Sequence, residues 1–116
     1  MNLTKDFSMS EFWCPCCKSI NMSPIFMKNL QELRDIYAQP MVINSGYRCK
    51  SHNSKVGGVE NSKHLSGIAA DIAVHDAHSR YRLVQIALRL GFKGIGIYKS
   101  FIHLDTRAAD PVIWTG

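Results

Sequence analysis

The sequence lacks the features that mark membrane-spanning, exported, repetitive or multidomain proteins. No apolar run approaches the roughly 20 residues that a helix needs to cross a bilayer. Residues 1–8 contain no apolar stretch of the kind found in secretory signal peptides, so we expect the protein to be made in the cytoplasm. Internal repeats, low-complexity stretches and linkers are also missing. The 116 residues therefore predict one domain, residues 1–116, with a single modest core.

A cluster of basic residues is missing too, although 14 basic and 9 acidic residues give a net charge of +5. This charge favours an anionic partner, such as nucleic acid, a membrane surface or a cell-wall polymer. Nucleic-acid binders usually carry a basic stripe with interleaved aromatic residues, and this chain has none. We therefore expect no nucleic-acid partner and no stable membrane association, and we expect a monomer.

Cysteine is sparse, with residues only at positions 14, 16, 17 and 49. Cys14 and Cys17 form a Cys-x-x-Cys pair, which is one half of a common structural zinc site. A second such pair, or two histidines at zinc-finger spacing, is missing, so Cys16 and Cys49 would complete only an irregular site. In a chain without an export signal we favour unpaired, reduced thiols over this second metal site.

Two helices are predicted from capping residues and helical periodicity. The first begins at Ser23-Pro24, where serine suits the N-cap and proline the first helical position. It should stop near Gln39, because the following proline cannot continue a helix. The second should run from about Ser79 to Leu90, with Gly91 as its C-terminal stop.

Four short strands are predicted, over residues 41–44, 68–74, 94–98 and 101–106. The last two are close enough in sequence to form a hairpin. Alternation turns Asp71 away from the apolar face of its strand and places His103 and Asp105 on one face of the last strand. Residues 45–60 are polar and predict a loop with one helical turn at most. Together, the predicted helices and strands indicate an α+β fold with a small, mainly antiparallel sheet and flanking helices.

Two histidines and one aspartate match the composition of a catalytic zinc site. His64 lies at the edge of a predicted strand, Asp71 follows seven positions later within it, and His103 lies on the last strand. Such sites commonly use three protein ligands and leave a fourth position for water. Zinc lowers the pKa of that water towards 7 and polarises a scissile carbonyl. The alternative is that all three are ordinary surface or core residues.

The motif Ser-x-His-x-x-Gly-x-Ala-x-Asp runs from Ser62 to Asp71, and a strand with His-x-Asp at His103 follows. This pattern resembles the zinc D-Ala-D-Ala carboxypeptidases and their relatives, over roughly residues 41–106. The relatives include D,D-dipeptidases of vancomycin resistance, phage L-alanyl-D-glutamate endolysins and periplasmic murein endopeptidases. The hedgehog signalling domain shares their fold, so the resemblance implies a hedgehog/DD-peptidase-like architecture.

The resemblance implies one catalytic Zn²⁺ ion with three ligands, His64, Asp71 and His103. It implies that Arg48, in a Ser-Gly-Tyr-Arg element, grips a substrate carboxylate with its planar fork; a solvated loop charge is the alternative. Ser62 matches a position that touches substrate, and a hydroxyl that caps the loop is its alternative. Tyr98 follows Gly-Ile-Gly-Ile and either lines the cleft, where glycines permit close backbone approach, or packs in the sheet.

The general base is where this chain departs from the family. Many relatives carry Glu or Asp three residues before the last histidine ligand, and here that residue is Ser100. Other relatives carry a histidine two residues before it, and here that residue is Phe101. Asp105 remains, on the same strand face as His103. It either takes a proton from metal-bound water, the catalytic role that we favour, or orients His103.

These residues predict a zinc peptidase that cuts peptidoglycan stem peptides or cross-links, as a D-Ala-D-Ala carboxypeptidase or an endopeptidase. Peptidoglycan peptides are then its partners. A phage or prophage lysis enzyme released through a membrane pore, or a virion component, fits a chain without an export signal. The alternative is a non-catalytic zinc-binding module with the hedgehog-like fold. Ser100 favours that alternative, whereas Arg48 and Asp105 oppose it, because a pure scaffold needs neither.

Overall fold

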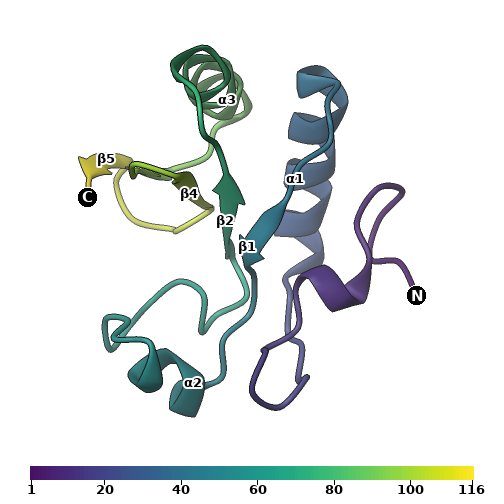
Figure 1. Ribbon diagram of the computed structural model, residues 1–116, viewed down its shortest axis with the longest axis vertical. Helices are drawn as coiled ribbons and strands as arrows, with labels where there is room; N and C mark the ends of the chain where they lie inside the picture. The colour runs from purple at the N-terminus through teal and green to yellow at the C-terminus, as the bar shows by residue number, and fades with distance from the viewer.

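A five-stranded sheet lies at the centre of the computed structural model, which describes residues 1–116 (Figure 1). The order across the sheet is β1-β2-β4-β3-β5. The strands are β1 (Ile43–Ser45), β2 (Ala69–Ala73), β3 (Gly94–Ile97), β4 (Phe101–Asp105) and β5 (Val112–Thr115). Neighbours pair antiparallel except β3 and β5, which are parallel. The helices are α1 (Pro24–Tyr37), α2 (Lys50–Lys55) and α3 (Ala77–Leu90), so the predicted α+β class is confirmed.

Helix α1 begins where its capping residues predict. The Ser23 hydroxyl accepts a hydrogen bond of 3.2 Å from the backbone N–H of Phe26, and proline follows at the first helical position. The helix ends at Tyr37 and not near Gln39, because Ala38 adopts the left-handed conformation, with φ of 59°. A left-handed residue at this position closes a helix by bonding back to its last turn, so α1 stops before the proline is reached.

Helix α3 begins two residues before the predicted Ser79. The reason is its N-cap, Asp76, whose carboxylate accepts the backbone N–H of Ser79 at 2.8 Å. Gly91 follows the last residue with φ of 84°, which confirms the predicted C-terminal stop.

Three parts of the chain differ from the prediction. Strand β1 covers Ile43–Ser45 instead of residues 41–44, and its pairing with β2 is irregular. The segment 45–60, predicted mainly as loop, contains the six-residue helix α2, whose N-cap is Cys49. Strand β5 was not predicted at all, because it lies at the sheet edge, is largely exposed and so lacks a buried apolar face in its sequence.

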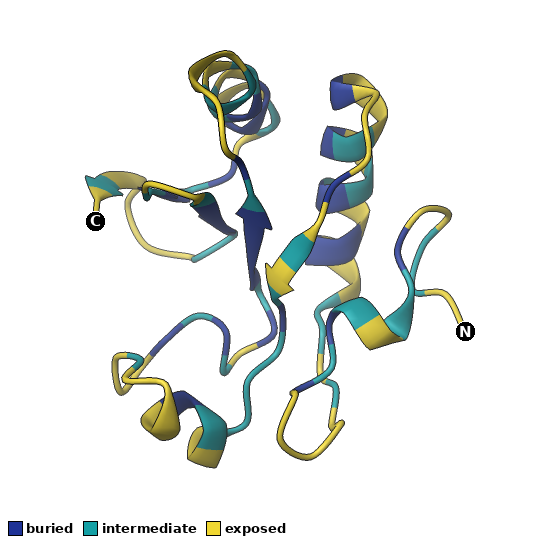
Figure 2. Ribbon diagram, viewed as in Figure 1, coloured by how far each residue is buried: buried dark blue, intermediate teal, exposed yellow.

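The core lies between one face of the sheet and the helices α1 and α3. Figure 2 shows buried residues on the inner sides of both helices and along β2. The sheet contributes alternate residues, which share one face: Ala70, Ile72, Ile95, Ile102 and Leu104. The intervening residues of β2 and β4 point to the opposite face, away from the helices, and they include every acidic and histidine side chain of these two strands.

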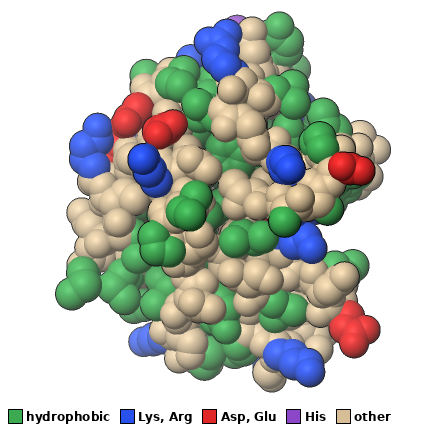
Figure 3. All heavy atoms as spheres, turned by 180° about the vertical axis from the view of Figure 1, so that it is seen from behind, with side chains coloured by type: hydrophobic (Ala, Val, Ile, Leu, Met, Phe, Trp, Pro, Cys, Tyr) green, Lys and Arg blue, Asp and Glu red, His purple; other side chains and the backbone are tan.

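Basic side chains are spread over the molecule. On the face seen in Figure 3, Lys and Arg side chains lie apart, separated by hydrophobic and neutral atoms. That face therefore offers no continuous basic track for a nucleic-acid backbone. None of the three helices combines the length and apolarity that crossing a bilayer requires.

Candidate metal centre

Strand register places the site residues in one row across the sheet. Asp71 of β2 lies opposite His103 of β4, His103 lies opposite Gly96 of β3, and Gly96 lies beside Trp114 of β5. Gly96 leaves the space that Trp114 fills, because a Cβ there would lie 2.7 Å from the indole ring. The indole in turn lies 5.2 Å from the His103 ring, centroid to centroid. The row therefore depends on a glycine at its third position.

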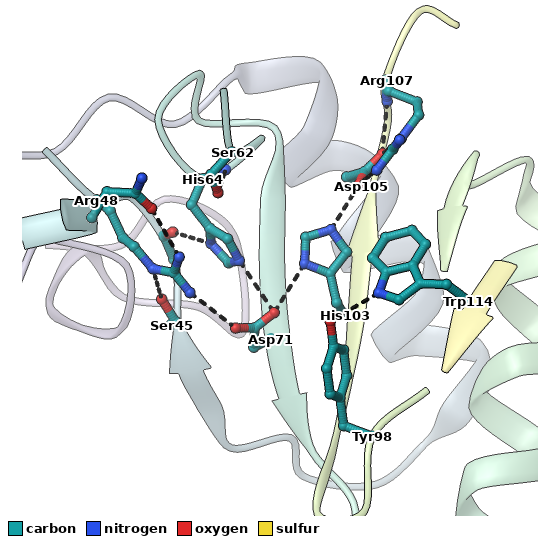
Figure 4. A network of polar contacts seen from close by, with 12 residues as sticks. Ser45, Arg48, Ser62, His64, Asp71, Tyr98, His103, Asp105, Arg107 and Trp114 are labelled. Carbon is teal, nitrogen blue, oxygen red and sulfur yellow. Dashed lines mark hydrogen bonds and ion pairs between the residues drawn. The ribbon is translucent and has the colours of Figure 1, made fainter. Parts of the chain in front are cut away.

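The side chains of His64, Asp71 and His103 converge on one point (Figure 4). Asp71 Oδ1 lies 3.2 Å from His64 Nε2 and 3.1 Å from His103 Nδ1, and all three residues are buried. Around a tetrahedral zinc ion with ligand distances of about 2.0–2.1 Å, neighbouring ligand atoms lie about 3.3 Å apart. These two distances, with all three atoms within 4.8 Å of one another, fit a single ion of that size, and a tetrahedral ion would have one position left for a non-protein ligand.

The other ring nitrogen of each histidine is already engaged. His64 Nδ1 lies 2.7 Å from the carbonyl oxygen of Gly46, which can only accept, so Nδ1 carries the proton and Nε2 is free to bind a metal. His103 Nε2 lies 2.7 Å from a carboxylate oxygen of Asp105, which leaves Nδ1 as the nitrogen that could bind a metal. Contacts of this kind hold the rings in orientation and raise the basicity of the ligand nitrogen.

The electrostatics of the centre favour a cation. Burial would raise the pKa of Asp71, but hydrogen bonds with His103 and His64 outweigh it and lower the pKa to about 2. Burial would lower the pKa of His103, but contacts with Asp105 and Asp71 outweigh it and raise the pKa. The two carboxylates on either side of the ring therefore stabilise positive charge at His103.

Asp105 lies behind His103 and is fully buried. Besides His103 Nε2, its carboxylate accepts Nη2 and Nε of Arg107 at 2.7 and 2.9 Å. Burial would raise the pKa of Asp105, but hydrogen bonds with Arg107 and His103 outweigh it and hold the pKa below its usual value. Gly94, its neighbour on β3, has no room for a side chain, because a Cβ would overlap the Asp105 carboxylate.

A cavity of about 630 Å³ opens at the converging ligands. Besides the three converging residues, its lining comes from the loop after α2, from three aromatic residues and from two arginines: Tyr98, Phe101, Trp114, Arg48 and Arg107. The Tyr98 hydroxyl accepts a hydrogen bond of 2.8 Å from Trp114 Nε1, and its ring stacks on Phe101 with centroids 4.4 Å apart. Tyr98 therefore both lines the cavity and packs against its neighbours. Asp105 is not part of the lining.

Arg48 lines the cavity beside Asp71, with 3.5 Å between Nη2 and Asp71 Oδ2. Its Nε donates to Ser45 Oγ at 3.2 Å, and its Nη1 donates to Asn53 Oδ1 at 3.1 Å. A guanidinium has five N–H groups, so these three bonds leave two for a ligand. Ser62 also lines the cavity, and its hydroxyl accepts the backbone N–H of His64 at 3.2 Å, which caps the loop.

Three side chains of the site escaped the sequence interpretation. Arg107 carried a readable signal, because it continues the alternation of His103 and Asp105 by two more residues. Trp114 belongs to β5, the strand that the sequence did not predict, and the structure places it at the cavity. Asn53 carried no signal; it is buried, holds Arg48 and donates to the carbonyl of Val59 at 2.8 Å.

Two histidines and an aspartate that converge beside an open cavity form the arrangement of a mononuclear metallohydrolase. The family model for peptidase M15 matches residues 5–105, so the chain belongs to the peptidase M15 family. The chain is also similar to the zinc D-Ala-D-Ala carboxypeptidase of Streptomyces albus G, with 36% identity over 95 residues. That match covers 78% of this chain but only 37% of the carboxypeptidase.

Proposed function

We propose that this protein is a zinc metallopeptidase that hydrolyses peptide bonds in peptidoglycan stem peptides or cross-links. The observation that carries the proposal is the convergence of His64 Nε2, Asp71 Oδ1 and His103 Nδ1 at the cavity. Membership of the peptidase M15 family and similarity to a zinc D-Ala-D-Ala carboxypeptidase support this substrate class.

The three ligand atoms suit zinc. Two imidazole nitrogens and one carboxylate oxygen form a common zinc set, and the distances from Asp71 Oδ1 to the two nitrogens are those expected between ligands of a tetrahedral ion. When bound, zinc would polarise the scissile carbonyl and bring the pKa of a bound water towards neutrality. The side chains around the cavity then bind the peptide and hold it in place.

Arg48 is the residue that we assign to substrate selection. Stem peptides carry carboxylates, and Arg48 has two N–H groups left for a planar pair of charge-assisted hydrogen bonds. Ser45 and Asn53 hold the guanidinium in place, so little side-chain freedom is lost when a carboxylate binds. Ser62 and Tyr98, which line the same cavity, are the further substrate contacts that we propose.

Asp105 is assigned to orienting His103. Its carboxylate is fully buried, outside the cavity lining, and already accepts hydrogen bonds from His103 and Arg107. A carboxylate so strongly stabilised in its charged form is a weak base and has no route to the substrate. We therefore prefer the orienting role over the direct proton transfer that the sequence favoured.

One observation favours the alternative, a non-catalytic zinc-binding module. Among the residues that line the cavity, Asp71 is the only one with a carboxylate, and we assign it to the metal. A hydrolase needs a group that accepts a proton from the attacking water. Apart from the three proposed metal ligands, the lining offers no carboxylate or imidazole, so that acceptor would have to be a group of the substrate itself.

The experiment is mass spectrometry of purified muropeptides after incubation with zinc-loaded protein. We expect a new fragment from the wild type, which also identifies the bond that is cut, and none from His64→Ala. Arg48→Ala should cut much more slowly, whereas Lys55→Ala should match the wild type, because exposed Lys55 lies outside the cavity. If the wild type binds zinc through His64 yet leaves every muropeptide intact, the binding module is the correct function.

We further propose the cell wall as the place of action, because the net charge of +5 favours an anionic polymer. A role as a phage lysis enzyme is the finer form of this proposal. Co-expression with a membrane pore protein tests it: lysis should require both the pore and an intact His64. Lysis that persists with His64→Ala would contradict the proposal.

A further inference from the structure

Four cysteine thiols lie close together next to Arg48 in the chain, and the function proposed above uses none of them. Cys14, Cys16 and Cys17 lie in the loop after the 3-10 helix η1 (Met9–Glu11), and Cys49 is the N-cap of α2. The sulfur of Cys16 lies 3.4 Å from those of Cys14 and Cys49, and the latter two are 3.6 Å apart. All four sulfur atoms lie within 4.8 Å of one another.

We propose that Cys14, Cys16, Cys17 and Cys49 bind a structural zinc ion through four sulfur ligands. Around a tetrahedral zinc ion with Zn–S distances of about 2.3 Å, sulfur atoms lie about 3.8 Å apart. The separations among Cys14, Cys16 and Cys49 lie within about 0.4 Å of that value. A disulfide would join only two of the four atoms, at about 2.05 Å, and would leave the others unexplained.

The backbone around the thiols is folded into a tight turn. The N–H of Lys18 donates to the carbonyl of Cys14 at 2.7 Å, and the N–H of Cys14 donates to the carbonyl of Ser19 at 2.7 Å. Lys18 has φ of 60°, a left-handed conformation that costs a lysine about 1 kcal/mol. A metal bound to Cys14, Cys16 and Cys17, which lie within this turn, would offset that cost.

Two backbone N–H groups point at the sulfur atoms. The N–H of Cys49 donates to Cys14 Sγ at 3.5 Å, and the N–H of His52 donates to Cys49 Sγ at 3.4 Å. Such bonds stabilise negative charge on sulfur, which four thiolates around a divalent ion carry in excess. Lys18 and Lys50 directly follow Cys17 and Cys49 in the chain and add positive charge nearby. Four thiolates select zinc or iron and disfavour hard cations such as Mg²⁺ and Ca²⁺.

The site would fasten the N-terminal segment to the residues that shape the cavity. Cys49 directly follows Arg48, and the Cys14–Cys49 contact closes a loop of 35 residues. Nearby, the N–H of Tyr47 donates to the carbonyl of Phe12 at 2.8 Å. Gly46 packs so closely on Phe12 that a Cβ would lie 2.7 Å from its backbone. Gly46 also supplies the carbonyl that orients His64, so this zinc ion would stabilise the same segment that serves the other centre.

Metal content and the spectrum of the cobalt-substituted protein test the proposal. The full chain should bind two zinc ions, and His64→Ala should retain one, held by the cysteines. With cobalt, thiolate ligands give a charge-transfer band in the near ultraviolet that histidine and carboxylate ligands do not. We expect this band in the wild type and equally in His64→Ala, and its loss in Cys14→Ser/Cys49→Ser.

Because His64→Ala keeps all four cysteines, its spectrum decides the matter even if the double cysteine variant does not fold. One zinc ion per wild-type chain, none in His64→Ala and no thiolate band would overturn the proposal. So would the loss of two free thiols in the unreduced, denatured protein, which would show a disulfide. The cobalt band does not depend on peptidase activity, so failure of the proposed function would leave this test unaffected.

Discussion

His103 and Asp105 are joined by a 2.7 Å hydrogen bond between Nε2 and Oδ2, on the side of the imidazole opposite Asp71. The partner carboxylate is fully buried and is held on its other side by Arg107. This contact fixes which nitrogen of His103 faces the metal position. It is also the reason why we assign Asp105, which the sequence suggested as a proton acceptor, to orienting His103.

Asp105→Asn distinguishes a role of Asp105 in orienting His103 from a role as proton acceptor. The amide keeps the shape but loses the charge, so we expect zinc affinity at the catalytic centre to fall about 10-fold to 100-fold. Cleavage of muropeptides should return when zinc is added in excess, because the variant lacks only ligand support. The measurement pairs a zinc-chelator competition with the rate at saturating zinc. A rate that stays abolished at full occupancy would restore Asp105 as the proton acceptor.

Arg48→Lys tests the carboxylate fork. Lysine keeps the positive charge but cannot form two parallel hydrogen bonds, so about 1.5–3 kcal/mol of substrate binding should be lost. We expect kcat/KM to fall about 10-fold to 100-fold, mainly through KM, in steady-state assays with a carboxylate-bearing peptide. Lys55→Arg, which exchanges the same two residue types at an exposed site outside the cavity, is the matched control. Equal effects of both changes would rule out a specific role for Arg48.

Gly94→Ala, on the strand next to Asp105, should disturb the proposed metal centre by displacing the Asp105 carboxylate. Its methyl group would overlap the Asp105 carboxylate, and forcing apart a packed site costs about 1–3 kcal/mol. We expect a lower thermal midpoint together with weaker zinc binding at the histidine site. Gly91→Ala is the control, because nothing lies within 4 Å of its Cβ and only its φ of 84° is unfavourable. That variant should lose about 1 kcal/mol of stability and keep its zinc affinity.

Stability of the metal-free protein should depend on pH through His103. Its pKa is raised in the folded state, so this contribution is complete below the unfolded pKa of about 6.5. It is lost as pH rises through the higher folded pKa. Thermal unfolding in chelator should therefore give a lower midpoint at about pH 8 than at about pH 6. Asp71, with a pKa of about 2, stays ionised over this range.

Stabilisation of the protein by zinc should increase with pH, because zinc must displace the proton from His103. The rise in midpoint on adding zinc should be larger at about pH 8 than at about pH 6. His103→Gln serves as the reference, since it keeps the cysteine cluster but removes the titrating ring. If the thermal midpoint of metal-free His103→Gln falls between pH 6 and pH 8 as much as that of the wild type, the pH dependence comes from another group.

The sequence by itself determined the features that depend on near neighbours along the chain. The N-cap at Ser23 and the glycine stop at Gly91 set one end of each long helix through local hydrogen bonds and left-handed backbone. Alternation within β2 and β4 separated Asp71 and His103 from the apolar face, because successive side chains point to opposite sides of a strand. Burial of that apolar face leaves the polar side chains to line the opposite surface.

Only the tertiary structure decided which atoms face one another. The carbonyl of Gly46 selects the tautomer of His64, and backbone atoms leave no trace in a sequence pattern. Arg107 hydrogen-bonds to the Asp105 carboxylate outside the cavity lining, because the chain after β4 folds back onto that carboxylate. The cysteines at 14 and 49 are 35 residues apart, and only packing of the N-terminal segment against residues 46–49 brings them together. Long-range contacts of this kind depend on how the elements pack, which local preferences do not specify.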